Sequence, residues 1–330
     1  MSILETIHRL QFTEREAAHD LLRLFIQDVF GLDVAEVSLR PLAVSLNSFN
    51  GFLTLTDGTR LFFKSHVEPG SVIAEYYNSD LLEQAGYPIL RPLYVSTTPG
   101  QQMLLYEVVE DQSVFDVAWA IERGTLGTEA LAALYAAQQA ADENLWRIYQ
   151  ATLGWQDASS HARAPIHQLF HHRLTRGRLD EFYGAGTVIQ LPGLGAVPME
   201  KVRRAQWCIN GVVFRESLDE VIVRARTLLE PAREGPSVVG HGDAHNGNLF
   251  MRHRAGPPPV LVYFDPAFAG RHDPLLDLVK PLYHNVHAMW MYFPAELEQE
   301  RGATLTLQGE RLVVSYPPGL RPVREMFWRS

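Results

Sequence analysis

The segment from Val238 to Asp265 constrains the fold of this chain more than any other part of the sequence. It begins with an apolar run and continues through a loop rich in Gly, Asp, His and Asn. Two further apolar runs, Asn248–Met251 and Val260–Phe264, flank a Gly-Pro-Pro-Pro sequence that is typical of a turn. The pattern predicts a strand, a polar loop and a hairpin in succession, which gathers polar side chains at the ends of strands.

Three polar side chains of this segment suit phosphate and metal chemistry. Asp243 lies in the loop, Asn248 follows it, and Asp265 ends the hairpin. A carboxylate that can act as a base, together with two hard oxygen ligands, suits Mg²⁺ bound to substrate phosphates. A His/Asp metallohydrolase is an alternative, because His241, Asp243 and His245 could also surround Zn²⁺ or Fe²⁺.

A longer motif surrounds these residues. The sequence reads His241-Gly242-Asp243-x-His245-x-x-Asn248, then Phe264-Asp265, then Asp273-Pro274-x-x-Asp277-Leu278. This combination resembles the aminoglycoside phosphotransferase and choline kinase-like family, a branch of the protein-kinase-like fold. The resemblance implies an α+β, two-lobed fold: a small antiparallel β-sheet N-lobe with one helix, and a larger, mainly helical C-lobe. It also implies that ATP binds between the lobes.

The resemblance assigns a role to each residue of the motif. Asp243 is the catalytic residue that orients and deprotonates an acceptor hydroxyl, while Asn248 and Asp265 bind Mg²⁺. We favour structural support of the loop over metal binding for the two histidines. The supporting residues are then His241, His245, Asp273 and Asp277.

The first third of the chain has the pattern of a small antiparallel sheet. Thr13 and Glu16 have the form of a capping box, and a helix is expected from there to Phe30. A second helix is expected from Ser71 to about Ala85. The expected strands are Val37–Val44, Phe52–Thr56, Arg60–Lys64, Leu93–Thr97 and Gln102–Glu107.

Lysine is scarce in this chain, and one lysine stands where a kinase needs it. Lys64, Lys201 and Lys280 are the three lysines, and Lys64 ends a predicted strand. Kinases place a lysine on the third strand of the small lobe, where it pairs with a glutamate and binds nucleotide phosphates. Glu75, in the helix that follows, is the expected partner of Lys64.

The remaining nucleotide contacts are expected from a turn and from the hinge. The sequence has no Gly-x-Gly-x-x-Gly loop; instead Leu46–Gly51 resembles the phosphate loop of this branch, with Ser48 and Asn50 as phosphate-binding candidates. A plain hairpin turn is an equal alternative there. The backbone from Glu107 to Val109 would meet the adenine edge of ATP.

These assignments divide the chain into two lobes. Residues 1–109 form the nucleotide-binding lobe, the hinge lies at about 106–111, and residues 110–330 form a helical lobe with the catalytic loop at 240–250. Helices are expected at Gly127–Gln150 and Glu216–Leu229, and a hairpin of undetermined role at 304–316. The basic cluster at 171–178 fits an anionic acceptor, although a solvated helix face is favoured.

Composition and charge exclude several classes of protein. The net charge of −9 disfavours nucleic acid as a partner. Cys208 is the one cysteine, so an internal disulfide is impossible. No signal peptide and no apolar run of about 18 residues is present, so we expect a cytoplasmic protein without a membrane partner. A homo-oligomer is possible, because the 304–316 hairpin could pair with another chain.

The expected function is an ATP- and Mg²⁺-dependent small-molecule kinase. The γ-phosphoryl group would move to a hydroxyl of an aminoglycoside, an amino sugar, a choline-like alcohol or a related metabolite. A Ser/Thr protein kinase of the same fold is one alternative, but the chain between Asp265 and Asp273 is too short for a peptide-docking segment. A non-catalytic nucleotide-binding module is another. The sequence leaves open the acceptor and the choice between ATP and GTP.

Overall fold

The chain folds into two compact units. The computed structural model describes residues 2–40, 48–66, 74–253, 258–294, 302–317 and 321–329, and for Ser48, His66 and residues 74–77 it describes the backbone alone. Unit 1 consists of Met1–Gln112 and Val262–Ala267, and unit 2 consists of Ser113–Leu261 and Phe268–Ser330. The short segment 262–267 therefore belongs with the N-terminal third of the chain.

Unit 1 is built on an antiparallel sheet of five strands in the order β1-β2-β3-β5-β4. The helix α3 (Ala74–Ala85) comes between β3 and β4 in the chain. The strands are β1 (Val34–Leu39), β2 (Ser48–Leu55), β3 (Arg60–His66), β4 (Tyr94–Ser96) and β5 (Met103–Glu107).

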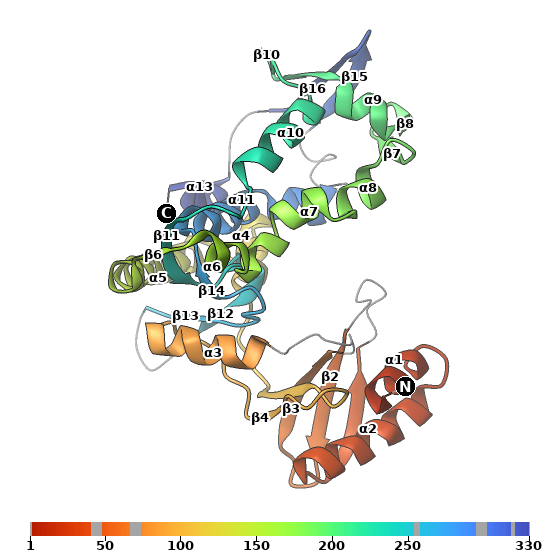
Figure 1. Cartoon of the computed structure of the whole chain (residues 1–330), viewed down its shortest axis with the longest axis vertical. Coiled ribbons are helices and arrows are strands. Elements are labelled where there is room, and N and C mark those ends of the chain that lie inside the picture. Colours follow the sequence, from red (N-terminus) through yellow and green to blue (C-terminus); the bar gives the residue numbers. More distant parts are fainter. Residues whose placement is uncertain are drawn as a thin grey trace. The chain divides into compact units, whose positions relative to one another are not determined.

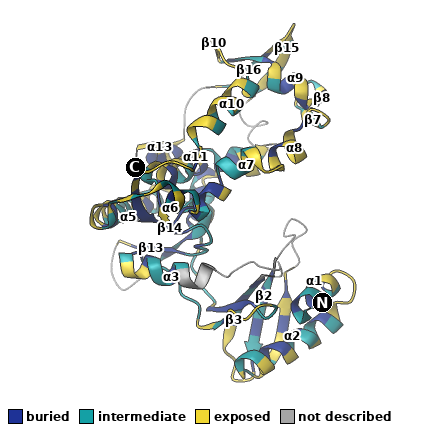
Figure 2. Cartoon of the chain, in the orientation of Figure 1, coloured by how far each residue is buried: buried dark blue, intermediate teal, exposed yellow. Residues whose placement is uncertain are grey.

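Two helices, α1 (Ile3–Leu10) and α2 (Arg15–Phe30), cover one face of this sheet (Figure 1). Their apolar sides pack on alternate residues of the strands, such as Leu53, Leu61 and Phe63, which are almost fully buried. In Figure 2 the outer side of α2 is exposed, whereas much of β2 and β3 is buried or half-buried. This face therefore holds the main core of unit 1.

The capping box predicted at Thr13 is wrong. The residue before α2 is Glu14, and it makes no side-chain cap. The capping box of this region belongs to α1, where Ser2 Oγ accepts from the Glu5 N–H and a Glu5 carboxylate oxygen accepts from the Ser2 N–H. Both sites have the Ser/Thr-x-x-Glu pattern, so the pattern alone does not select between them.

The turn predicted at Leu46–Gly51 is also wrong for the part that the structure describes. Residues 48–51 form the first half of β2, and Gly51 pairs with Phe63 of β3. Gly51 leaves no room for a side chain, since a Cβ atom there would lie 2.2 Å from the Ser38 carbonyl oxygen. Residues 41–47, which include the end of the predicted strand Val37–Val44, lie outside the described residues, as do residues 71–73 of the predicted Ser71 helix.

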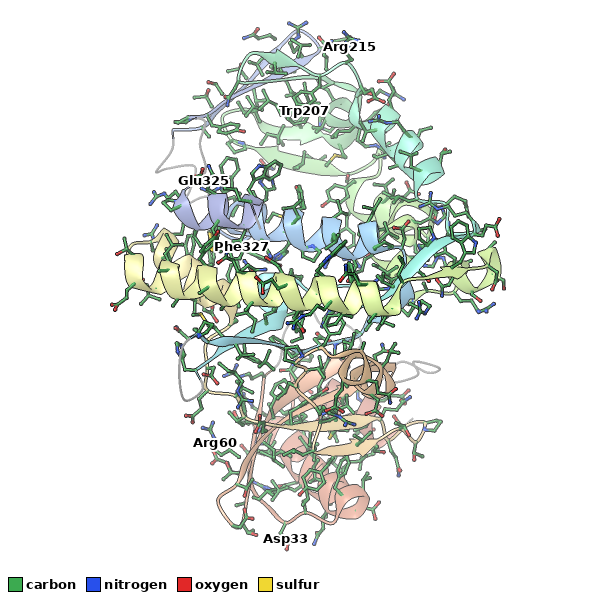
Figure 3. All side chains as sticks on the ribbon, turned by 90° about the vertical axis from the view of Figure 1, so that its left-hand side faces the viewer. Asp33, Arg60, Trp207, Arg215, Glu325 and Phe327 are labelled. Atoms are coloured by element: carbon green, nitrogen blue, oxygen red, sulfur yellow. The ribbon has the colours of Figure 1, made fainter. Side chains whose placement is uncertain are left out.

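Unit 2 contains most of the helices. Figure 3 shows the long α5 side-on. Tyr149 of α5 donates a hydrogen bond to Asp277 of α11. Phe327 of α13, labelled in Figure 3, is buried. The helices are α4 (Val114–Glu122), α5 (Thr128–Thr152), α6 (Ala158–Ala162), α7 (His171–Thr175), α8 (Arg178–Tyr183), α9 (Met199–Arg204), α10 (Leu218–Leu228), α11 (Pro274–Tyr292) and α13 (Pro322–Arg329), with short 3₁₀ turns η1 (Pro165–Gln168) and η2 (Asn246–Asn248).

Unit 2 has more strands than the mainly helical pattern predicts. The hairpin predicted at 304–316 is present as β15 and β16, and β16 pairs in parallel with β9 of the same chain. Trp207 of β9, labelled in Figure 3, packs with the apolar cluster beneath this sheet. The strands are β6 (Gly154–Gln156), β7 (Val188–Leu191), β8 (Gly195–Pro198), β9 (Gln206–Ile209), β10 (Val212–Val213), β11 (Gly235–Gly240), β12 (Leu249–Arg252), β14 (Gly270–His272), β15 (Thr304–Gln308) and β16 (Arg311–Ser315), and β13 (Val260–Tyr263) spans the boundary between the units.

The prediction of an α+β protein with antiparallel sheets is confirmed. Unit 1 combines one sheet with three described helices, and unit 2 combines helices with several small sheets. Among the described residues, no helix is both long enough and apolar enough to cross a membrane.

Candidate active site

Unit 1 holds an ion pair between two residues that the sequence selected. Lys64 Nζ lies 2.6 Å from Asp265 Oδ1, although the residues are far apart in the chain. The Lys64 side chain is 18% exposed and that of Asp265 is 39% exposed. Asp265 has a φ of 55°, a left-handed backbone conformation that is uncommon for any residue other than glycine. The backbone thus turns sharply at Asp265.

The segment that carries Asp265 is fixed to unit 1 by backbone hydrogen bonds. The Leu90 N–H donates to the Tyr263 carbonyl at 2.8 Å, and the Tyr263 N–H donates to the Pro88 carbonyl at 2.8 Å. Further along, Asn78 Nδ2 of α3 donates to the Pro266 carbonyl at 2.8 Å. These contacts hold both sides of Asp265, so its carboxylate stays beside β3.

The sheet of unit 1 offers a second, more polar face around Lys64. Lys64 pairs with Asn50 of β2 and with Leu104 of β5, and directly opposite residues share one face of a sheet. Phe62 and Tyr106 lie on this face too, with ring centroids 6.5 Å apart. The amide group of Asn50 and the ammonium group of Lys64 therefore lie on the same face of the sheet as apolar and aromatic side chains.

The other nucleotide-binding candidates are Ser48, Glu75, Glu107 and Val109. Ser48 begins β2, and its side chain lies outside the described residues. The Glu75 side chain also lies outside them, so the predicted Lys64–Glu75 pair stays a prediction. Glu107 ends β5 and is exposed, and Val109 follows it outside the sheet and is half-buried.

In unit 2 the loop after β11 depends on two glycines. A Cβ atom on Gly240 would lie 2.4 Å from Asp277 Oδ2 and 2.5 Å from His272 Nε2. Gly242 has a φ of 80°, and a Cβ atom there would lie 2.3 Å from the Phe268 carbonyl oxygen. Only glycine fits both positions, so the backbone passes unusually close to neighbouring polar groups.

Asp277 of α11 fixes this loop. Its Oδ1 accepts from the Gly242 N–H at 2.5 Å and lies 3.2 Å from His272 Nε2, while its Oδ2 accepts from Tyr149. Burial opposes ionisation of this carboxyl, but the hydrogen bonds from His272, Tyr149 and Gly242 hold the pKa of Asp277 below its ordinary value. An ionised, fully hydrogen-bonded carboxylate therefore anchors the loop that carries Asp243.

Asp243 is the carboxylate that this loop presents. Its side chain is 13% exposed, Lys280 of α11 makes an ion pair with Oδ1, and His245 Nε2 lies 3.5 Å from the same oxygen. Asn248 Nδ2 donates to the Asp243 backbone carbonyl at 2.9 Å, which closes the loop on itself. Because the amide nitrogen of Asn248 is used in this way, its amide oxygen is the atom that suits a metal ion.

The two histidines of the motif contact the loop backbone and a neighbouring ring. His241 Nδ1 accepts from the Asp243 N–H at 3.3 Å, and His245 Nδ1 accepts from the Gly247 N–H at 3.1 Å. The His245 ring also stacks on His284, with centroids 3.9 Å apart. In the described part of the chain, no three His, Cys, Asp or Glu side chains are grouped as a metal site.

Asp273 lies at the start of α11, not at the loop itself. Its Oδ1 accepts from the Leu275 N–H at 2.9 Å, and Arg233 Nη2 lies 3.4 Å from Oδ2. It therefore caps the helix that presents Asp277 to the loop.

The sequence motif assigned no role in the site to three residues of α11 that contact the loop. Besides Lys280, these are His284, which stacks on His245, and Asn285, whose Oδ1 accepts from the Asn246 N–H at 2.8 Å. They follow Asp277 at helical spacing, which places them on one side of α11. That spacing was visible in the sequence and could have selected them.

The comparisons with known proteins give a family and several similar structures. A macrolide 2'-phosphotransferase type I shares 15% identity over 80% of this chain and 76% of its own, with a TM-score of 0.41. A spectinomycin phosphotransferase in complex with ADP and spectinomycin shares 13% identity over 85% and 77%, with a TM-score of 0.43. A putative fructosamine-3-kinase from Thermobifida fusca shares 18% identity over 84% and 95%, with a TM-score of 0.39.

The comparison with curated proteins gives no match. The family model described as the phosphotransferase enzyme family matches residues 39–322, which include the Lys64 strand, the Asp243 loop and the Asp265 turn. Most of the chain lies within this match, and the chain therefore belongs to the phosphotransferase enzyme family.

Proposed function

We propose that this protein transfers the γ-phosphoryl group of ATP to a hydroxyl group of a small metabolite. The observation that carries the proposal is the environment of Asp243. This carboxylate lies on a loop that Asp277 anchors, that Gly240 and Gly242 shape, and that contains Asn248. Family membership supports phosphotransfer as the reaction.

Asp243 is proposed to act as the base. The acceptor oxygen forms a bond to the γ-phosphorus while the bond from that phosphorus to the β–γ bridging oxygen breaks, and ADP leaves with the bond electrons. The acceptor O–H bond breaks in the same reaction, and its proton passes to the Asp243 carboxylate. The transition state of phosphoryl transfer is loose, so orientation of the hydroxyl is the main contribution expected of this residue.

Lys64 is proposed to bind the phosphates of ATP from the polar face of the unit 1 sheet. Its ammonium group already holds one carboxylate, Asp265, and Asn50 lies opposite it in the ladder. Glu75 is the proposed partner that orients Lys64, Ser48 a further phosphate contact, and the backbone from Glu107 to Val109 the contact of the adenine edge.

The donor set of the chain fits Mg²⁺. Asp265 supplies a partly exposed carboxylate next to the ammonium group of Lys64, and Asn248 supplies an amide oxygen whose nitrogen is already bonded. Carboxylate and amide oxygens are ligands that Mg²⁺ accepts together with phosphate oxygens. When bound, the ion would neutralise charge on the phosphates.

The test is an ATP-consumption screen over hydroxyl-bearing metabolites with the wild-type enzyme and Asp243→Asn. We expect one acceptor class to be saturable, and Asp243→Asn to lower kcat by about 10²- to 10⁴-fold while ATP still binds. Asp180→Asn on α8, an exposed aspartate, is the matched control. A folded Asp243→Asn enzyme of wild-type rate would refute the assignment.

Two alternatives are distinguished when peptides that contain Ser and Thr are added to the same screen. A Ser/Thr protein kinase would phosphorylate peptides and leave small acceptors unmodified. A nucleotide-binding module would bind Mg·ATP without consuming it in the presence of any acceptor. In the structure the chain between Asp265 and Asp273 includes β14, which pairs with β11, and this favours a small acceptor over a docked peptide.

A further inference from the structure

His245 contacts the Asp243 loop through both nitrogens of its ring. Its Nδ1 accepts from the Gly247 N–H at 3.1 Å, and its Nε2 lies 3.5 Å from Asp243 Oδ1. The ring lies close to the backbone, because a Cβ atom on Gly247 would be 3.0 Å from His245 Cε1. His245 thus joins the backbone that follows it to the carboxylate that precedes it.

The contact with Gly247 determines which ring nitrogen of His245 carries the hydrogen. A backbone N–H can only donate, so Nδ1 offers its lone pair and carries no hydrogen. A neutral imidazole has one N–H, which is therefore on Nε2, the nitrogen that faces Asp243. A protonated ring would carry hydrogens on both nitrogens and would be unable to accept from Gly247.

A neighbouring ring on α11 favours the same neutral form. His284 stacks on His245, with ring centroids 3.9 Å apart and ring planes 21° apart. Burial lowers the pKa of His284 to about 3, so this ring is neutral near pH 7. Two imidazolium rings stacked so closely would repel each other, whereas two neutral rings do not.

The two carboxylate oxygens of Asp243 differ in their surroundings. Oδ1 is buried, Lys280 makes an ion pair with it, and His245 Nε2 faces it. The side chain as a whole is nevertheless 13% exposed. The exposed surface therefore lies almost entirely on the other side-chain atoms, of which Oδ2 is the one that can take a proton.

We propose that His245 is a positioning residue, which holds Asp243 Oδ1 with its Nε2–H so that Oδ2 faces the acceptor and receives its proton. This inference rests on the proposed function, in which Asp243 is the base. Catalytic hydrogen bonds are often long in the absence of substrate, which fits the 3.5 Å separation. His241 contacts Asp243 differently, since its Nδ1 accepts from the Asp243 backbone N–H.

Two substitutions of His245 separate its two contacts. Asparagine places an amide oxygen where Nδ1 stands, so His245→Asn keeps an acceptor for the Gly247 N–H and loses the donor to Asp243. Glutamine places an amide N–H near the position of Nε2, so His245→Gln keeps the donor and loses the acceptor. A residue that only supports the loop needs the contact with Gly247, whereas a residue that positions Asp243 needs the other.

Steady-state kinetics with the acceptor that the screen identifies measures which contact matters. His245→Asn is expected to lower kcat by about 10- to 100-fold, with both KM values and the melting temperature close to those of the wild-type enzyme. His245→Gln is expected to keep kcat within about threefold and to lower the melting temperature by about 2–4 °C. His253→Asn and His253→Gln, at an exposed position, are the matched controls and should change neither quantity. The inference is overturned if His245→Asn keeps the wild-type kcat, or if His245→Gln loses as much kcat as His245→Asn.

Nitrogen-15 NMR of the histidine-labelled enzyme determines the tautomer without any acceptor. The signals of His245, assigned by their loss in His245→Gln, should show a hydrogen on Nε2 and none on Nδ1. Asp243→Ala should shift the Nε2–H proton signal, because it removes the oxygen that accepts this hydrogen. A hydrogen on Nδ1, or an Nε2–H signal that Asp243→Ala leaves in place, overturns the inference.

The NMR and kinetic results separate this inference from the proposed function. If the wild-type enzyme phosphorylates no compound, the proposed function fails, and the expected NMR result still supports His245 as the residue that orients Asp243. If an acceptor is phosphorylated in an Asp243-dependent reaction but His245 carries its hydrogen on Nδ1, the proposed function stands and the positioning role is refuted.

Discussion

The two units each hold an aspartate in an ion pair with a lysine, and the two pairs differ in how they are built. In unit 1 Lys64 projects from a strand, and Asp265 lies on a short segment held by hydrogen bonds to residues 88–90 and to α3. In unit 2 Lys280 projects from a helix, and Asp243 lies on a loop anchored by Asp277. Two of the three lysines in the chain take part in these pairs.

The two aspartate side chains differ in exposure, and this difference favours a different role for each. Asp265 is 39% exposed, whereas Asp243 is 13% exposed. A partly exposed carboxylate can change partners and bind a hydrated metal ion, while a more buried carboxylate is better suited to orient one proton. Substitutions in the two pairs are therefore expected to change different kinetic parameters.

The largest expected effect compares the two aspartates directly. Asp243→Asn should lower kcat by about 10²- to 10⁴-fold and leave the affinity for Mg·ATP within about threefold of the wild-type value, because it removes the carboxylate that we propose as the proton acceptor. Asp265→Asn and Lys64→Met should weaken Mg·ATP binding. Steady-state kinetics and titration with a fluorescent ATP analogue measure the two parameters separately. Equal effects of Asp243→Asn and Asp265→Asn on kcat and on Mg·ATP affinity would contradict the assignment of different roles to the two aspartates.

The second prediction concerns the anchor of the unit 2 pair. Asp277→Ala removes a buried carboxylate that accepts from the Gly242 N–H and from Tyr149, and it leaves both donors without that partner. We expect the free energy of unfolding to fall by about 3–5 kcal/mol. Urea denaturation measures this, with Asp180→Ala as the exposed control. A loss below about 1 kcal/mol would mean that the loop does not depend on Asp277.

The third prediction compares one glycine from each unit. Gly242 and Gly58 have φ values of 80° and 86°, but a Cβ atom on Gly242 would overlap the Phe268 carbonyl, whereas at Gly58 it would meet nothing within 4 Å. Gly58→Ala should therefore cost about 1–2 kcal/mol of unfolding free energy, the cost of a left-handed residue alone. Gly242→Ala should cost more, since steric overlap is added. Equal losses in urea denaturation would show that the loop relaxes around the new methyl group.

Local sequence patterns selected three of the four residues in the two ion pairs, but they did not predict which residue pairs with which. The motif selected Asp243 and Asp265, and lysine scarcity selected Lys64. That Lys64 meets Asp265 depends on the attachment of residues 262–267 to unit 1, which involves long-range hydrogen bonds to Pro88 and Leu90. Such contacts leave no periodic trace in the sequence. The contact of Lys280 with Asp243 likewise depends on how α11 is turned toward the loop.

Strand prediction failed where the signals were short or ambiguous. The β7–β8 hairpin contains Pro192 and Gly193 between two apolar runs, which is a turn signal, but each strand has four residues. The beginning of β2 has the sequence of a phosphate-binding turn, because Ser48, Asn50 and Gly51 are turn formers in isolation. Pairing with β3 overrode that local preference.

The last prediction concerns the loss of stability of unit 2 on acidification. All described histidines that are less than a tenth exposed belong to unit 2: His161, His167, His241, His272 and His284. Burial lowers the pKa of His167 to about 4. Between pH 4 and the ordinary histidine value of 6.5, the unfolded chain binds a proton that the folded chain does not, so acidification lowers stability.

Replacing His167 should remove that pH dependence. Between pH 7 and pH 5 the free energy of unfolding of the wild-type protein should fall by about 2 kcal/mol more than that of His167→Gln. Urea denaturation at the two pH values measures the difference, and His253→Gln, at an exposed position, is the matched control. If His167→Gln and the wild-type protein lose the same stability on acidification, the His167 ring is protonated in the folded state and the acid sensitivity of unit 2 has another origin.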